Sequence, residues 1–101
     1  MKVTNINNTS GRTCSCENWL AHWSKFSDQT GAVLCSAQMC NKWATVGAHV
    51  QIDSAWDRNW YIVPLCSRCN AQHGASLEIR NDVPLISANA AETCGKQFRF
   101  I

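Results

Sequence analysis

Four of the seven cysteines in this 101-residue sequence stand in two closely spaced pairs, an arrangement typical of metal ligands. The pairs are Cys35 with Cys40 in the segment CSAQMC, and Cys66 with Cys69 in the segment CSRC. Thiolates from two such pairs can bind one tetrahedral Zn²⁺ ion, with Zn–S distances of about 2.3 Å. The spacing therefore predicts one structural zinc site, and the alternative is that these are ordinary buried thiols.

Three further cysteines, Cys14, Cys16 and Cys94, lie outside the two pairs. If the two ends of the chain come together, these thiols and His22 could hold a second metal ion. The alternatives are plain packing of the three thiols, or a disulfide between Cys94 and one of the other two. An odd number of cysteines argues against a fully paired disulfide framework.

The composition excludes several classes of protein. Apolar residues make up 46% of the chain and charged residues 16%, which is typical of a globular domain. The polar start MKVTNINNTSGR has no apolar core of a signal peptide, and no segment reaches the roughly 18 apolar residues of a membrane span. We therefore expect a cytoplasmic protein without a membrane partner, in a compartment that favours metal binding over disulfides.

One helix and one hairpin must position the candidate ligands. Residues 16–27 have the apolar spacing of an amphipathic helix, with Ser15 as a candidate N-cap and Gly31 just beyond the end. The segment ATVGAHVQI predicts a strand in which Gly47 marks a bulge or a close backbone approach. The segment WYIVPL predicts a second strand, ended by Pro64, and the two strands are expected to pair as a hairpin.

Shorter elements complete the predicted α+β domain. The segment CSRCNAQHG is expected to form a short helix that begins with the second cysteine pair, and SLEIR, VPLIS and QFRFI are candidates for brief strands. Residues 1–13 are rich in Asn, Thr, Ser and Gly and are expected to form a flexible tail. No repeat or linker divides residues 1–101, so we expect a single zinc-stapled domain.

The predicted order of a cysteine knuckle, a β-hairpin and a helix that starts with the second cysteine pair is the order of a treble clef. The segments GAHV and WYIVPLCSRCN, together with the CSAQMC pair, also resemble the HNH family of nucleases, the His-Me finger group. The resemblance covers residues 34–74 and is most specific at PLCSRCN. It implies a zinc-binding HNH-like domain that acts as a metal-dependent endonuclease on DNA or RNA.

The same resemblance implies roles for His49, Asn59 and Asn70, and helical spacing adds His73. His49 matches the family's general base, which activates water, and the near-neutral pKa of an ordinary imidazole suits that role. Asn59 matches an asparagine that braces the loop behind the histidine. Asn70 matches a ligand of the catalytic metal. His73 lies one helical turn further along the same face, where it could complete that metal site. A divalent ion at this site, such as Mg²⁺, Mn²⁺ or Ni²⁺, would stabilise the leaving oxygen.

A second class of function is a non-catalytic treble-clef zinc module that binds a protein or a nucleic acid. In this case His49 is a structural residue, His73 caps its helix, and Asn70 bonds a cysteine sulfur or the backbone. A net charge of +2 and a pI near 8.2 allow a nucleic-acid partner but do not indicate one. Exposed aromatic and arginine side chains would form the contact surface, and the candidates are Trp43, Trp56, Trp60, Arg58 and Arg68.

Overall fold

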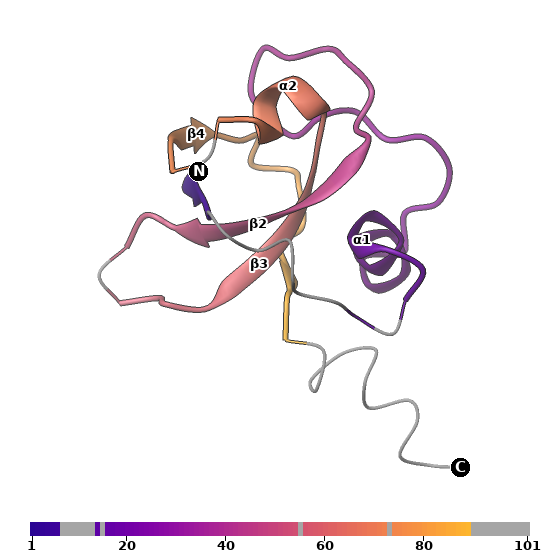
Figure 1. The fold of residues 1–101 in the computed structure, drawn as a ribbon, viewed down its shortest axis with the longest axis horizontal. Coiled ribbons are helices and arrows are strands. Elements are labelled where there is room, and N and C mark those ends of the chain that lie inside the picture. The colour runs from indigo at the N-terminus through magenta and orange to yellow at the C-terminus, as the bar shows by residue number, and fades with distance from the viewer. Residues whose placement is uncertain (7–13, 15, 55, 73, 90–101) are drawn as a thin grey trace.

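The computed structural model of the 101-residue chain describes residues 1–6, 14, 16–54, 56–72 and 74–89. These residues form a small α+β fold, as predicted, with one sheet and two helices (Figure 1). The elements in chain order are β1 (Lys2–Asn5), α1 (Trp19–Ser27), β2 (Val46–Ile52), β3 (Trp60–Leu65), α2 (Ser67–Asn70), β4 (Ser76–Glu78) and β5 (Ile86–Ser87). The predicted strand QFRFI lies outside the described residues.

The sheet of the described residues has five strands in the order β4-β1-β2-β3-β5, and all of its neighbouring strands are antiparallel. Its longest pairing is the predicted hairpin between β2 and β3, which runs from Val46 opposite Leu65 to Gln51 opposite Trp60. Pro64 lies inside β3, so the strand continues one residue beyond the predicted end. The hairpin is therefore the frame on which both helices are placed.

The expectation of a flexible tail over residues 1–13 is wrong for Lys2–Asn5, which form β1 in the interior of the sheet. The side chains of Val3 and Asn5 are buried, with exposed fractions of 0% and 1%, whereas Lys2 faces solvent. This alternation has the period of a strand. Hydrogen bonds to β2 on one side and β4 on the other hold the segment, and these partners are distant in sequence. Residues 7–13 lie outside the described part of the chain.

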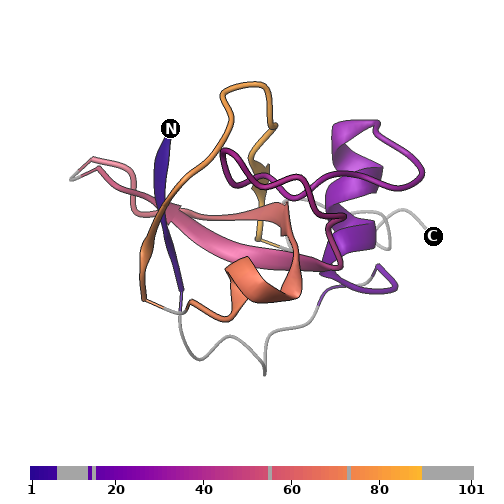
Figure 2. The same ribbon diagram turned by 90° about the horizontal axis from the view of Figure 1, so that it is seen from above.

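The two faces of the hairpin are covered by different parts of the chain. On one face, Ala48 and Val50 pack in an apolar core that also contains Cys35 and Cys66. His49 lies between them in β2 and points to the opposite face, where α1 packs across β2 and β3. Figures 1 and 2 show α1 and α2 on different sides of the hairpin. The sheet therefore separates the side chains near α1 from Cys35 and Cys66.

Helix α1 begins at Trp19, three residues later than expected, because Asn18 is its N-cap. The Asn18 side chain accepts a hydrogen bond from the Ala21 backbone N–H at 2.8 Å, which satisfies one of the donors that a helix start leaves unpaired. The predicted cap, Ser15, lies outside the described residues. The helix ends at Ser27, before the left-handed residue Asp28. Within the described part of the chain, neither helix has the length and apolar composition needed to cross a membrane.

The close backbone approach predicted at Gly47 is confirmed. A Cβ atom on this residue would lie 2.4 Å from the backbone carbonyl carbon of Trp19, far inside van der Waals contact. The register of the hairpin is continuous past Gly47, so the residue does not form a bulge. A glycine at this position therefore lets the first turn of α1 rest directly on β2.

Candidate metal centre

The first cysteine pair is held in a knuckle loop, residues 34–43, whose ends are joined by a β-bridge between Leu34 and Trp43. Inside the loop, the backbone N–H of Cys35 donates to the carbonyl oxygen of Lys42 at 2.9 Å. The backbone N–H of Cys40 donates to the carbonyl oxygen of Ala37 at 3.2 Å. These bonds turn the chain so that both thiols face the same side.

The second pair is held by the start of α2. Cys66 is the N-cap of this helix, and Cys69 lies in its single turn. The backbone N–H of Cys69 donates to the Sγ atom of Cys66 at 3.5 Å, so a thiol takes the place of the usual oxygen cap. The helix is shorter than the predicted segment CSRCNAQHG, because it ends at Asn70.

The two pairs converge. The Sγ atoms of Cys35, Cys40, Cys66 and Cys69 all lie within 4.8 Å of one another, and the contact between Cys40 and Cys66 is 3.9 Å. Four sulfurs at about 2.3 Å from a tetrahedral zinc would be about 3.8 Å apart. All four are free thiols rather than disulfides. The four cysteines chosen from spacing therefore form a cluster that could bind a metal ion such as zinc.

Backbone polarity and burial act in opposite directions on these thiols. The Cys69 backbone N–H is the main cause that lowers the pKa of Cys66 to about 7. Burial raises the pKa of Cys35, and it also raises that of Cys69, where the neighbouring thiols add to the effect. Four thiolates this close would repel one another. A divalent cation held by these cysteines would offset the repulsion with its positive charge and keep the thiols deprotonated.

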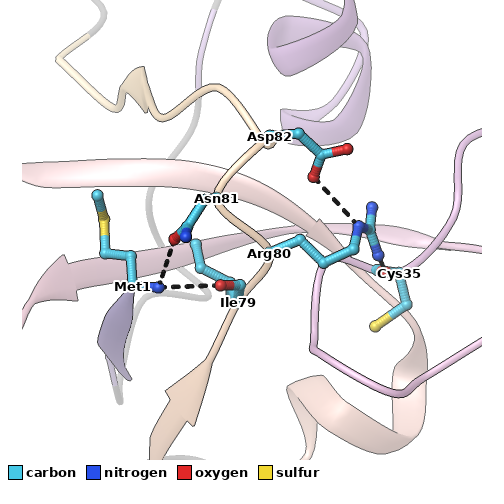
Figure 3. A network of polar contacts seen from close by, with 6 residues as sticks. All are labelled: Met1, Cys35, Ile79, Arg80, Asn81 and Asp82. Atoms are coloured by element: carbon cyan, nitrogen blue, oxygen red, sulfur yellow. Dashed lines mark hydrogen bonds and ion pairs between the residues drawn. The ribbon is translucent and has the colours of Figure 1, made fainter.

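Arg80 is a further residue of this centre, and no local pattern in the sequence singled it out. Its guanidinium donates to the backbone carbonyl of Cys35 and forms an ion pair with Asp82, with 3.4 Å between Arg80 Nε and the Asp82 carboxylate (Figure 3). The backbone N–H of Arg80 also donates to the carbonyl oxygen of Ser36 at 3.0 Å. The segment after β4 therefore holds the knuckle loop in place through hydrogen bonds to its backbone. Lys42 and Arg68, which adjoin the pairs in sequence, are both exposed.

His49, the candidate general base, is buried on the other face of the sheet. Its side chain is 5% exposed, and its ring lies edge-on against Trp19, with 4.6 Å between ring centroids. Trp60 contacts it from the neighbouring strand, at a centroid distance of 6.1 Å. Among the described residues, His49 belongs to no cluster of histidine, cysteine and carboxylate side chains with metal-binding geometry.

The other candidate catalytic residues do not gather around His49. Asn59 is exposed beyond the paired end of the hairpin, where its backbone N–H donates to Asp57 at 2.9 Å. Asn70 closes α2, and its backbone carbonyl accepts a hydrogen bond from the Asn5 side chain at 2.8 Å. His73 lies outside the described residues. The structure therefore brings the four cysteines together but gives no shared site for His49, Asn59 and Asn70.

A second cluster contains Cys14, Cys16 and His22, whose ligand atoms also lie within 4.8 Å of one another. Cys94, which the sequence grouped with them, lies outside the described residues. Comparisons of the chain with protein-family models, with curated proteins and with solved structures gave no match. The interpretation of both clusters therefore depends on their own geometry and chemistry.

Proposed function

We propose that this protein is a non-catalytic zinc module of the treble-clef type, which uses its metal-bound knuckle loop to bind another protein. The convergence of the four cysteine sulfurs is the observation that carries the proposal. In this arrangement Zn²⁺ joins the knuckle loop to the start of α2, with the β2–β3 hairpin between them in sequence. Four protein sulfurs fill a tetrahedral shell, which is the pattern of a structural rather than a catalytic zinc site.

The size of the domain favours a structural role for this ion. A chain of about 100 residues buries a modest core, and a bound structural zinc adds on the order of 10 kcal/mol of apparent binding energy. Two of the proposed ligands, Cys35 and Cys66, are already part of the apolar core, with exposed fractions of 0% and 4%. Metal binding at this point would therefore stabilise the core and the surface loop together.

The burial of His49 supports the non-catalytic proposal over an HNH nuclease. A general base must reach a water molecule and the phosphodiester. The ring of His49 instead packs against Trp19 and Trp60, and its side chain is 5% exposed. Asn70 follows a cysteine on the other side of the hairpin, so the two residues implied by the resemblance face different parts of the molecule.

The knuckle loop carries a surface suited to a protein partner. Its side chains Leu34, Met39 and Trp43 are large, apolar and exposed, with exposed fractions of 42%, 101% and 62%. We call these three residues the knuckle patch. Methionine and tryptophan are enriched at protein interfaces, and an anchored loop presents them at a low entropic cost. These three side chains are apolar, and a net charge of +2 gives little attraction for a phosphate backbone, so we favour protein over nucleic acid.

Metal analysis tests the zinc site. Native mass spectrometry should find zinc bound to the wild-type protein, and the C40S variant should lose the ion of this site and unfold at a much lower temperature. S36A is the matched control, because Ser36 is a neighbour of Cys35 and its buried hydroxyl has no hydrogen-bond partner among the described residues. Unchanged zinc content in C40S would contradict the proposed site.

A nuclease assay tests the absence of catalysis. Wild-type protein and H49A should both leave supercoiled plasmid, single-stranded DNA and RNA intact in the presence of Mg²⁺, Mn²⁺ or Ni²⁺. Cleavage by the folded wild type that disappears in H49A would reject the non-catalytic proposal and support the endonuclease.

Matched tryptophan variants test the binding surface. W43A alters the knuckle patch, whereas W56A removes a tryptophan that is 94% exposed in the turn between β2 and β3. A protein captured from an extract of the source cells by wild type and W56A, but not by W43A, should bind again as a purified one-to-one complex. Oligonucleotide binding at physiological salt that is weakened by W43A would instead identify a nucleic-acid partner.

A further inference from the structure

We propose that Cys14, Cys16 and His22 form a second zinc site, on the face of the sheet opposite the first. The two Sγ atoms and one ring nitrogen of His22 lie within 4.8 Å of one another. The contact between Cys16 Sγ and His22 Nδ1 is 3.8 Å. A sulfur and a nitrogen bound to one tetrahedral zinc at about 2.3 and 2.0 Å would be about 3.5 Å apart, so small side-chain shifts complete the geometry.

The hydrogen bonding of His22 favours metal ligation through Nδ1. Its Nε2 atom is 2.9 Å from the carbonyl oxygen of Ser87, which can only accept a hydrogen bond. Nε2 therefore carries the proton, and the lone pair of the neutral ring is on Nδ1, the atom that faces Cys16. Zinc-bound histidines commonly donate their second ring N–H to a backbone carbonyl in this way.

The ring of His22 is held in place by packing and by the helix that carries it. Its side chain is fully buried, at 0% exposure, between Trp19 and Phe26, whose ring centroids are 4.9 and 5.1 Å away. Its backbone N–H donates to Asn18, the N-cap of α1, at 2.9 Å. The ligand is therefore held by the first turn of a helix, while the segment before that helix supplies the two thiols.

The charges of this ligand set suit a buried divalent ion. Two thiolates balance the charge of Zn²⁺, and the neutral imidazole adds none, so the occupied site is electrically neutral. A neutral site carries a much smaller desolvation cost than an isolated ion. Without a metal ion, the two thiols and the imidazole would gain less free energy from lying together.

The second site is separate from the first. His22 lies on α1, and α1 packs on the face of the sheet to which His49 points. Cys35 and Cys66 lie in the core on the other face, with Ala48 and Val50. No ligand is shared, so variants of one ligand set leave the ligands of the other site in place.

Three protein ligands leave one position of a tetrahedron, which a water molecule can fill. The sequence contains one further thiol, Cys94, outside the described residues, but the proposed site does not depend on it. Through its ligands the ion would tie the segment before α1 to the helix, and the bond from His22 to Ser87 extends this link to β5. The second zinc would therefore hold the α1 face together, and it would differ from the first in having one open coordination position.

Native mass spectrometry of protein purified in zinc-containing buffer tests the inference. The wild type should carry two zinc ions per chain, and C14S and C16S should each carry one. Both variants are preferred to a substitution of His22, which would also remove the bond to Ser87. One zinc in the wild type, with no further loss in C14S and C16S, would overturn the second site and leave the proposed function intact.

Cadmium substitution followed by NMR assigns the two ions. Two resonances are expected, one at the chemical shift of a four-sulfur site and one at the lower shift of a mixed sulfur–nitrogen site. C16S should remove the second resonance and leave the first in place. If C16S abolishes the four-sulfur resonance while the mixed resonance remains, the ligand assignment is wrong; if the four-sulfur resonance is absent from the wild type, it is the proposed function that fails.

Discussion

At the scale of single residues, Arg80 is the side chain whose loss should weaken the proposed zinc site without removing a ligand. It donates to the carbonyl of Cys35, one bond away from the ligand's Cα atom. Groups that orient metal ligands typically contribute 10- to 100-fold to metal affinity. We expect R80A to weaken zinc binding by about 10-fold, measured by competition with a chromophoric chelator.

The control for this prediction is R58A, which removes an exposed arginine from the turn between β2 and β3. It makes the same change in net charge as R80A. Equal zinc affinities for R58A and R80A would show that Arg80 does not support the site.

Tyr61 provides a second prediction at this scale, because it is the single tyrosine of the chain. Its hydroxyl donates to the Asp57 carboxylate at 2.7 Å, and this hydrogen bond is the main reason that the pKa of Tyr61 is raised above its usual value of 10.0. The raised pKa favours the neutral phenol in the folded protein. Its stabilising contribution is therefore complete below pH 10 and is lost as the pH rises through the higher folded-state pKa.

An absorbance titration of tyrosinate should show a midpoint above pH 10 for the wild type. The D57N variant removes the negative charge and should move the midpoint down, toward the usual value. A wild-type midpoint at or below that of D57N would mean that the hydrogen bond between Tyr61 and Asp57 is not formed in solution.

At the scale of elements, the contact between α1 and β2 depends on Gly47. A methyl group there would meet the backbone of Trp19, which cannot move without a shift of the whole helix. Overpacking of this kind typically costs about 1–3 kcal/mol, and we expect G47A to lie at the upper end of that range. Chemical denaturation should show the loss as a lower midpoint with an unchanged slope.

Gly31 provides the comparison for G47A. It has a left-handed backbone, with φ of 80°, and a Cβ atom there would meet nothing within 4 Å. Asparagine tolerates this conformation, so G31N should cost less than about 1 kcal/mol. A G47A variant as stable as G31N would contradict the close approach of α1 to the sheet.

The elements that were predicted correctly have local signals. The β-branched and apolar residues of β2 and β3 indicated a hairpin, and the spacing of Trp19, Trp23 and Phe26 indicated α1. The start of α1 was misplaced because Asn18 competes successfully as the N-cap. β1 was missed because its neighbours β2 and β4 are remote in sequence, although the alternation of Lys2–Asn5 was visible.

The candidate sites also differ in whether the sequence signal is local or depends on residues from another element. The four clustered cysteines were found because the spacing within each pair is typical of metal ligands. The burial of His49 could not be deduced, because the partner that covers it, Trp19, comes from another element. Arg80 was missed for the same reason, since it reaches the Cys35 backbone from the segment after β4.

At the scale of the whole molecule, the domain should depend on bound metal for its tertiary structure. Removal of zinc with a strong chelator should abolish the near-ultraviolet circular dichroism of the tryptophans. A core of this size is modest, and without the ion it loses the largest single contribution to its stability. Addition of zinc should restore the signal, while Mg²⁺ should not, since it prefers oxygen ligands. A chelated, metal-free protein with an unchanged spectrum and melting temperature would contradict the structural role of the metal.

The interior position of β1 has a consequence for the order of events during synthesis. The ribosome makes β1 before all the other strands, yet its neighbour β4 comes after Cys69, the last of the four clustered cysteines. The sheet of a nascent chain therefore cannot be completed until all four clustered cysteines have been translated. Pairing between such remote segments is intrinsically slow. Stalled chains that end before Ser76 also lack β4, so protease should digest them far faster than released chains.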